Sequence, residues 1–334
     1  MWWLFSLASA LVQVGRNAVM KDLGHSLDEY INVWGRFFFL LPFALAASLV
    51  ARFPTVGPEY WLYSFLAGST QVISTLLLSK SFKYGAISVS VAIWKLQVVL
   101  VAVLGVIFLS ETVSSAGIAG ILVSLFGVYL LNVRRARISL AEPILLLFRE
   151  RGMRYALLAA LTLTPTILLF KKTAQLGDPY FSTLTNYIFA SLLILPLVIK
   201  KSVRHFRVLP RYLGRFFAMG LFGATATIFG SHAYIRSVAA YVEAVKQVEI
   251  PITLAVGVLF FNELERVQAI WPGCAILIVG LLILIFASCD LYPHSHTEKE
   301  FIQSRRKKIH PIHLRSPSDS ISFTLDRGPF HREH

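Results

Sequence analysis

Residues 1–290 of this chain form a succession of about ten apolar stretches, each close to the roughly 20 residues that a helix needs to cross a bilayer. In hydrocarbon a helix satisfies its own backbone hydrogen bonds, and these stretches exceed the roughly ten-residue strands of an outer-membrane barrel. The sequence therefore predicts an all-α membrane protein. The expected helices span about 2–20, 30–51, 60–79, 86–109, 114–132, 155–173, 180–199, 213–235, 238–261 and 266–288.

Composition argues against an ordinary soluble fold, because 56% of the residues are hydrophobic and 15% are charged, against about 25% charged residues in soluble domains. The formal net charge of +14 falls on connectors and the C-terminal tail, so nucleic acid is not a predicted partner. The two cysteines, Cys274 and Cys289, form neither a disulfide framework nor a metal-binding spacing. No cofactor is predicted.

A basic connector divides the apolar part of the chain into two halves of similar length. The predicted domains are a first five-helix repeat at 1–133, the connector at 134–154, a second five-helix repeat at 155–288 and a tail at 289–334. The tail is polar and basic, with too little apolar content to fold alone, so we expect it to be disordered.

The two halves align with one another in sequence. A shift of 152 residues places Gly68 on Gly220, Ala92 on Ala244, Gly105 on Gly257 and Glu111 on Glu263. Small residues and a glutamate that recur in order across several stretches favour a repeat over coincidence. A repeat with an odd number of helices inverts the second half relative to the first in the membrane.

Residues 85–131 and 239–284 each run from an apolar helix, through an acidic residue at a tight connector, into a glycine-bearing helix. In this pattern the chain resembles the EamA-like members of the drug/metabolite transporter superfamily, over about residues 1–288. The resemblance implies about ten helices in two inverted repeats around a central cavity, with the last helix of each half packed outside. It also implies a transporter rather than an enzyme.

A few charged residues lie inside the apolar stretches, where a charge costs about 2.5–3.5 kcal/mol on insertion scales unless water or a partner meets it. We identify them as Arg16, Arg36, Lys95, Glu243, Lys246 and Glu249. Gln13 and Asn17 share one helical face with Arg16, and Trp94 adjoins Lys95. We interpret this set as the lining of a solute pathway.

The ninth stretch is the most charged. Glu243, Lys246, Gln247 and Glu249 lie on one broad face, and Pro251 follows them. Pro251 lacks a backbone donor, so we expect the carbonyl of Gln247 to be freed and the helix to bend beside its acids. The predicted pathway residues are Gln13, Arg16, Asn17, Trp94, Lys95, Glu243, Lys246, Gln247 and Glu249.

Each of these residues receives an expected role. Arg16 and Lys95 are expected to meet anionic groups of the cargo, and Trp94 to form an apolar wall. Glu243 and Glu249 are expected to meet an amine or a proton. Proton coupling at Glu249 stays a hypothesis, because burial favours the neutral form of a carboxyl group while a nearby lysine favours the charged form.

The alternative to a pathway is packing alone. Glu243 would then pair with Lys246 three residues on, and Lys95 would pair with Glu249 across the bundle. We favour the pathway, because apolar residues in place of a buried ion pair are often no less stabilising.

The remaining polar residues of the stretches are expected to be structural. Glu111 and Glu263 suit the positive ends of the helices that follow them, and Ser110 or Thr112 suits the cap of the fifth helix. His232, Asn186 and Tyr187 are expected to be hydrogen-bonded core residues. Arg36 lies near the start of its stretch and is placed either in the pathway or at the interface.

The predicted function is secondary transport, by alternating access, of a small amphiphilic or zwitterionic metabolite, with export favoured. A flippase for a lipid-linked solute is the alternative. An intramembrane enzyme is a distant third, since the sequence carries no HExxH, no paired intramembrane aspartates and no phosphate-cradling glycine loop. The expected location is the plasma (inner) membrane, as a multi-pass protein with solute and lipids as partners. The oligomeric state is left open.

Orientation supplies the first test. Lys and Arg concentrate in the connectors after odd-numbered helices, which by the positive-inside rule places both termini outside. The family resemblance implies cytoplasmic termini, and a long basic tail resists translocation, so we expect the tail inside. Alkaline phosphatase and a fluorescent protein, each fused after His334, measure this directly. Phosphatase activity without fluorescence would favour the charge-based orientation.

Overall fold

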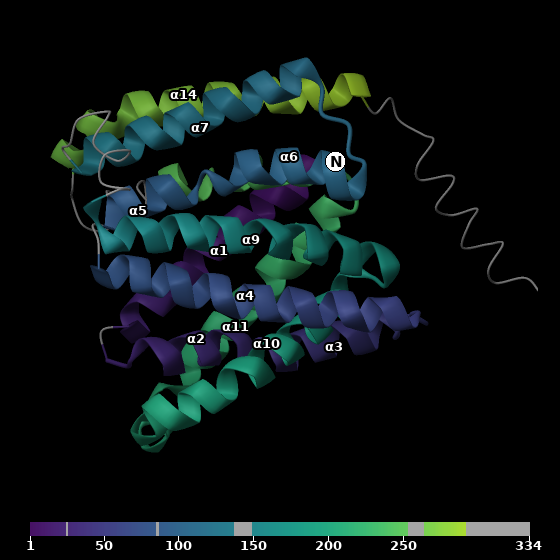
Figure 1. Ribbon diagram of the computed structural model, residues 1–334, viewed down its shortest axis with the longest axis vertical. Coiled ribbons are helices and arrows are strands. Elements are labelled where there is room, and N and C mark those ends of the chain that lie inside the picture. Colours follow the sequence, from purple (N-terminus) through teal and green to yellow (C-terminus); the bar gives the residue numbers. More distant parts are fainter. Residues whose placement is uncertain (25, 85–86, 137–148, 253–263, 292–334) are drawn as a thin grey trace, which may run out of the picture. The chain divides into compact units, whose positions relative to one another are not determined.

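The computed structural model describes residues 1–291 except 25, 85–86, 137–148 and 253–263, and its described secondary structure is entirely helical (Figure 1). The helices of the first half are α1 (Trp2–Gly24), α2 (Glu29–Phe38), α3 (Leu41–Ala51), α4 (Pro58–Tyr84), α5 (Ile87–Trp94), α6 (Gln97–Leu109) and α7 (Ser115–Ala136). Those of the second half are α9 (Arg151–Leu176), α10 (Pro179–Ser202), the short 3-10 helix η1 (Val203–Arg207), α11 (Leu209–Tyr234), α12 (Ala239–Lys246) and α14 (Leu264–Leu291). The predicted all-α fold is confirmed. Residues 253–261 of the ninth predicted helix lie outside the described residues.

Several helical segments are long and apolar enough to cross a membrane. Among the described residues they are Glu29–Ala51, Pro58–Tyr84, Arg151–Leu176, Pro179–Arg207 and Leu209–Tyr234. Shorter apolar helices cover Gln97–Leu109, Ser115–Leu131 and Trp271–Ala287. The chain is thus a multi-pass membrane protein.

Two aspartates begin corresponding helices of the two halves. Asp28 accepts hydrogen bonds from the backbone N–H groups two and three residues on, at 2.9 and 3.0 Å, and so caps α2. Asp178 caps α10 in the same way, at 2.7 and 2.9 Å. Each cap satisfies donors that a helix start leaves free, and so favours a tight turn from the preceding helix.

The predicted helices are interrupted at three described points. The helix predicted over residues 30–51 breaks at Phe39–Leu40, and the one predicted over 86–109 breaks at Lys95–Leu96. The third break lies at Gln247–Val248, after which residues 249–252 are helical again. At the last two breaks the backbone switches to bonds between residues three apart, Val98 N–H to Lys95 O at 3.2 Å and Ile250 N–H to Gln247 O at 3.0 Å.

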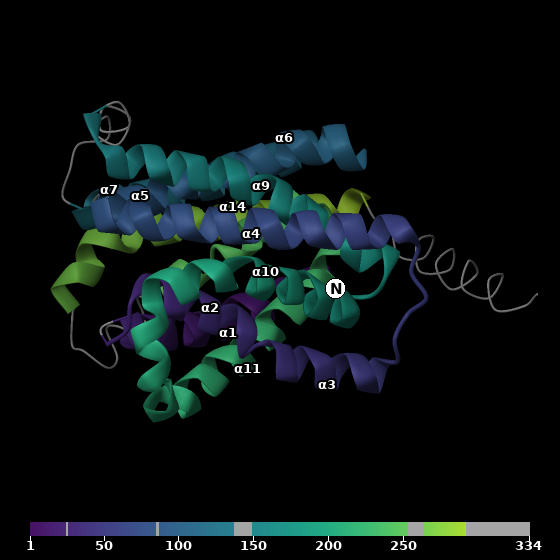
Figure 2. The ribbon, with the colours of Figure 1, turned by 60° about the horizontal axis from the view of Figure 1, so that its bottom comes forward.

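Helices α7 and α14 pack side by side through glycines (Figures 1 and 2). A Cβ atom on Gly127 would lie 2.8 Å from the carbonyl oxygen of Gly273, and one on Gly120 would lie 3.0 Å from that of Gly280. Only glycine permits backbones to approach this closely. Helices α7 and α14 are therefore held together by close backbone contacts.

The other helices pair across the two halves. Helix α1 packs against α11 and α4 against α9, while α10 lies against α2, α3 and α4. One apolar core surrounds Tyr241 and includes residues of α6, α7, α12 and α14, and another surrounds Phe37 and Phe216 from α2 and α11. The break at residues 95–96 separates α5 from α6, and the break at 247–248 directly follows α12. Helices α6 and α12 contact one another.

The expected cap of the fifth helix is wrong. Ser110 ends α6 with a left-handed backbone, φ 52°, and does not cap α7. Ser114 does so instead, because its Oγ accepts the N–H of Gly117 at 2.9 Å. The two caps expected from the sequence, Ser110 and Thr112, lie four and two residues too early, because several hydroxyl-bearing residues follow one another there.

The glycine contact predicts a selective effect of a single methyl group. Gly127→Ala would place a Cβ 2.4 Å from the backbone N of Leu277. This is a backbone atom within a helix, so it cannot move aside as the end of a side chain could. We expect a loss of about 1–3 kcal/mol of stability, typical of overpacking, measured as a lower Tm of the purified chain in detergent. Gly214→Ala is the matched control, since nothing lies within 4 Å of the position that its methyl group would take and alanine is the better helix former. Equal Tm values for the two variants would contradict the close approach.

Candidate functional site

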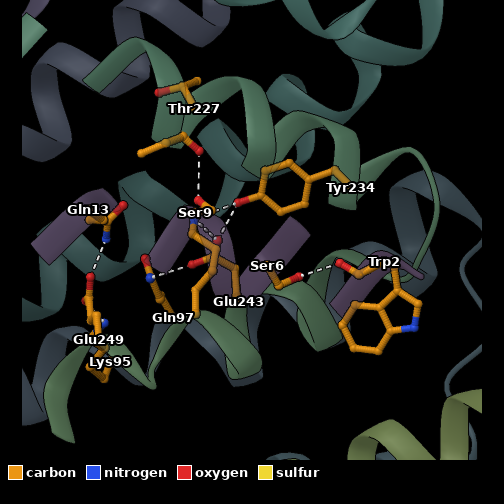
Figure 3. A network of polar contacts seen from close by, with 12 residues as sticks. Trp2, Ser6, Ser9, Gln13, Lys95, Gln97, Thr227, Tyr234, Glu243 and Glu249 are labelled. Atoms are coloured by element: carbon orange, nitrogen blue, oxygen red, sulfur yellow. Dashed lines mark hydrogen bonds and ion pairs between the residues drawn. The ribbon is translucent and has the colours of Figure 1, made fainter. Parts of the chain in front are cut away.

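The centre of the predicted pathway is an ion pair between the two halves. The Lys95 Nζ lies 2.8 Å from a carboxylate oxygen of Glu249, and the other oxygen accepts a hydrogen bond from the Gln13 side-chain amide (Figure 3). Lys95 occupies the first position of the α5–α6 break, and Glu249 follows the break after α12. Lys95 is 5% exposed and Glu249 7% exposed. Bulk water therefore contributes little to solvating either charge.

A second cluster forms around Glu243, one helical turn before the break. Its carboxylate accepts from the hydroxyl of Tyr234 and, at 3.4 Å, from the amide of Gln97 (Figure 3). It also accepts from Lys246 Nζ at 2.7 Å. Lys246 also reaches the Tyr234 hydroxyl at 3.3 Å. Gln97 begins α6, so this cluster too joins the two halves.

Both ion pairs of the packing alternative are thus present, Glu243 with Lys246 and Lys95 with Glu249. Packing alone leaves other polar atoms unexplained. Buried side-chain atoms without a hydrogen-bond partner among the described residues include Arg16 Nε, Trp94 Nε1, Gln97 Oε1 and both amide atoms of Gln247. Each unpartnered polar group in an apolar interior costs free energy, so a dry packing role does not account for this cluster.

The structure brings some of the predicted pathway residues together and leaves others apart. Gln13 and Lys95 both contact Glu249, and the Lys95 ammonium lies 5.0 Å from the centre of the Trp94 ring. The break beside Pro251 agrees with the expected bend. The expected free carbonyl is wrong, because Gln247 O accepts the N–H of Ile250.

Arg16 and Asn17 lie about one turn along α1 from Gln13. The Arg16 guanidinium donates to the Asn17 side chain at 3.3 Å, and Arg16 is 6% exposed. Arg36 of α2 has a buried Nε, and its guanidinium lies 4.0 Å from the sulfur of Met20 and 6.0 Å from the Phe37 ring. The structure therefore holds Arg36 among the helices.

Sequence reasoning missed one interior ion pair. Lys171 on α9 is 6% exposed and binds Glu111, and its Nζ also donates to the carbonyl of Ser237. Glu111 accepts the N–H of Ala239 as well, so it caps α12 from the other half of the chain. The expected role of Glu111 at the start of α7 is wrong. The sequence did offer a signal for this pair, because Lys171 is a charged residue inside the predicted helix at 155–173. Glu263 lies outside the described residues.

The residues expected to be structural agree with that expectation. Asn186 accepts from Ser64 at 2.8 Å and donates to Thr173 at 3.0 Å. His232 stacks on the Phe5 ring with centres 5.3 Å apart, and its Nδ1 lies 3.0 Å from a nitrogen of Arg236. These contacts satisfy both side chains without a cargo.

A separate recess of about 600 Å³ opens at the start of α2 and is lined by Asp28, Glu29, Tyr30, Lys83 and Lys201. Lys201 Nζ donates to the Tyr30 hydroxyl at 3.0 Å, and Asp28 lies 3.1 Å from His205. None of these residues belongs to the predicted pathway.

Comparison with known proteins bears on what this arrangement does. Residues 1–133 match the family model of the EamA-like transporter family. No curated protein sequence matches the chain. A solved structure titled "Crystal structure of protein" has 14% sequence identity and a TM-score of 0.69, covering 87% of this chain and 98% of that one, which shows a shared fold. The resemblance predicted from the sequence is confirmed over residues 1–133, and the match indicates a membrane transporter of small solutes.

The Lys171–Glu111 pair generates a prediction about stability. Lys171→Met or Glu111→Gln leaves the other charge buried without its partner, so each is expected to cost about 3–5 kcal/mol of stability. The double variant should lose less than the sum of the two, because neither charge then remains. Thermal unfolding of the purified variants measures this.

The control for that cycle is an exposed ion pair, Asp22 with Arg215 at 2.7 Å, whose side chains are 56% and 53% exposed. Asp22→Asn is expected to change stability by no more than about 1 kcal/mol. Simple additivity of Lys171→Met and Glu111→Gln would show that the two side chains do not interact in the membrane.

Proposed function

We propose that this EamA-like chain is a secondary transporter, and an exporter, that moves a small amphiphilic or zwitterionic metabolite by alternating access. The observation that carries the proposal is a network of buried charges that joins the two halves at two helix breaks, with unpartnered polar atoms beside it. A transporter needs such a place, where cargo exchanges with water deep in the membrane.

The energetics support this use of the charges. Ionisable groups at membrane depth are costly and typically mark solute or ion paths. A buried ion pair often adds no net stability over apolar residues of the same size. Lys95 with Glu249 is therefore poorly explained as packing, whereas a cargo with an amine and an anionic group would compete for both members of the pair.

Alternating access is supported by the relation between the halves. Lys95 and Gln247 lie 152 residues apart, which is the shift of the predicted repeat, and the chain breaks at both with the same bonding pattern. Under the predicted repeat, α1 corresponds to α9 and α4 corresponds to α11. The contact of α1 with α11 is therefore the counterpart of the contact of α9 with α4, and both are present. Discontinuous helices and paired repeats are how many secondary transporters build and expose a central site.

The proposed cycle follows from the contacts of Glu249. Its carboxylate binds both Lys95 and Gln13 of the first half. An amine of the cargo, or a proton, that occupies this carboxylate would release Lys95 and loosen the contact between the halves. Cargo binding and conformational change are thereby coupled through one group.

The experiment is uptake and efflux in proteoliposomes against a panel of amino acids, nucleosides and amphiphilic cations. Lys95→Ala and Glu249→Gln are each expected to lower transport at least about tenfold, because each leaves a buried partner unmatched. The double variant Lys95→Met with Glu249→Met removes both charges. It is expected to fold, as judged by Tm and monodisperse elution, and yet to remain inactive.

Asp22→Asn with Arg215→Gln is the matched control, a neutralised ion pair that is exposed. It should transport normally. Normal transport by the Lys95→Met, Glu249→Met double variant would assign the pair to packing and contradict the proposal. Competition by lipid rather than by soluble metabolites would favour the flippase, and flux that ignores an imposed pH gradient would exclude proton coupling.

A further inference from the structure

We infer that Arg16 and Arg36 together bind a doubly charged oxyanion of the cargo, such as a phosphate monoester or a dicarboxylate. The inference rests on the proposed transport function and names the chemistry of its substrate. It adds an anion-binding position at the two arginines to the Lys95–Glu249 pair.

The first step is the matching of charges in the interior. Three lysines of the polar network and of the contact between the halves have carboxylate partners: Lys95 has Glu249 at 2.8 Å, Lys246 has Glu243 at 2.7 Å, and Lys171 has Glu111. Neither arginine forms an ion pair with a carboxylate among the described residues. Arg16 and Arg36 therefore differ from these lysines in that no carboxylate balances their charge.

The second step is the state of the arginine donors. The Nε atoms of both Arg16 and Arg36 are buried and have no hydrogen-bond partner among the described residues. The other contacts of the two guanidinium groups are neutral: Arg16 donates a long hydrogen bond, 3.3 Å, to the Asn17 side chain, and Arg36 lies 4.0 Å from the Met20 sulfur and 6.0 Å from the centre of the Phe37 ring. A guanidinium offers a planar fork of donors that fits carboxylate and phosphate oxygens in pairs.

The third step is the proximity of the two groups. The Arg36 guanidinium lies 4.0 Å from the sulfur of Met20, which follows Arg16 by one turn on the same face of α1. The two like charges therefore lie near one another and repel. The Glu249 carboxylate accepts hydrogen bonds from Lys95 and Gln13. An anion with two negative charges would relieve the repulsion and occupy both forks, whereas a single negative charge would balance only one.

A structural role does not explain the pair. Two unmatched cations in a low-dielectric interior destabilise the protein that contains them, and apolar side chains would fill the same space at lower cost. Groups of this kind are retained where a ligand supplies the missing charge. The site lies beside the Gln13–Glu249–Lys95 contact on α1, so an anion bound there reaches the network that joins the halves.

Binding is tested on the purified full chain in neutral detergent. Inorganic phosphate and succinate are the probes, with acetate and glucose as comparators, and the readout is the rise in Tm with ligand concentration. Phosphate or succinate should raise the Tm, acetate less, and glucose not at all. Arg16→Gln and Arg36→Gln should each weaken the apparent affinity at least about tenfold.

The ligand-free Tm separates a binding role from a structural one. Because Arg16→Gln removes one of two repelling charges, the ligand-free variant should be no less stable than the natural chain. A lower ligand-free Tm, with unchanged response to phosphate and succinate, would overturn the inference. Arg16→Lys keeps the charge and removes the fork, so its response should be weakened but retained. Arg215→Gln is the exposed arginine control and should respond as the natural chain does.

Transport assays keep the two proposals distinguishable. Flux of a neutral or cationic solute that depends on Lys95, with no response to any anion, would overturn the anion site and leave the transporter. An arginine-dependent response to phosphate or succinate without flux of any solute would support the anion site and contradict transport. Protection by phosphatidylglycerol vesicles alone, with no effect of soluble anions, would assign the arginines to a lipid headgroup and overturn the inference.

Discussion

The structure depends on how charges are matched where water is scarce. A membrane-spanning bundle gains little from pulling apolar helices together, since lipid is as apolar as the helix surface. The contacts that specify which helices meet are therefore polar or unusually close. Here they are the Lys95–Glu249 pair, the Glu243 cluster and the Lys171–Glu111 pair, each of which connects one half of the chain to the other.

The helix breaks follow from the same constraint. A backbone carbonyl or amide at membrane depth must be satisfied within the protein, so a helix can be interrupted only where bonds to residues three apart or nearby side chains replace the lost ones. Lys95 and Gln247 occupy such points, and their carbonyls accept from Val98 and Ile250. The breaks bring polar side chains to the interface between the halves, and the rest of each helix stays regular.

The sequence predicts most of the helices because bilayer thickness fixes their length, and long apolar runs leave few alternatives. It also predicts the break at Gln247–Val248, since Pro251 removes a donor there. The break at Lys95–Leu96 has no proline or glycine near it, so nothing local signals it. Lys171 and Glu111 are distant in sequence, and their contact depends on how α9 packs, which no local pattern encodes. The pairing of Lys95 with Glu249 was foreseeable as an alternative because few acids lie at that depth.

The two kinds of contact between the halves differ in what they allow. Along α7 and α14 the backbones meet at glycines, and atoms of one helix fit between those of the other with no side chain to rearrange. A slide of one helix would force backbone atoms together, so this pairing behaves as a fixed element. The contacts at Lys95, Glu249 and Glu243 consist of long side chains that can exchange partners without moving the backbone far. In the proposed transport cycle, motion between the halves would therefore be concentrated at the charged network and its breaks, beside the proposed arginine site.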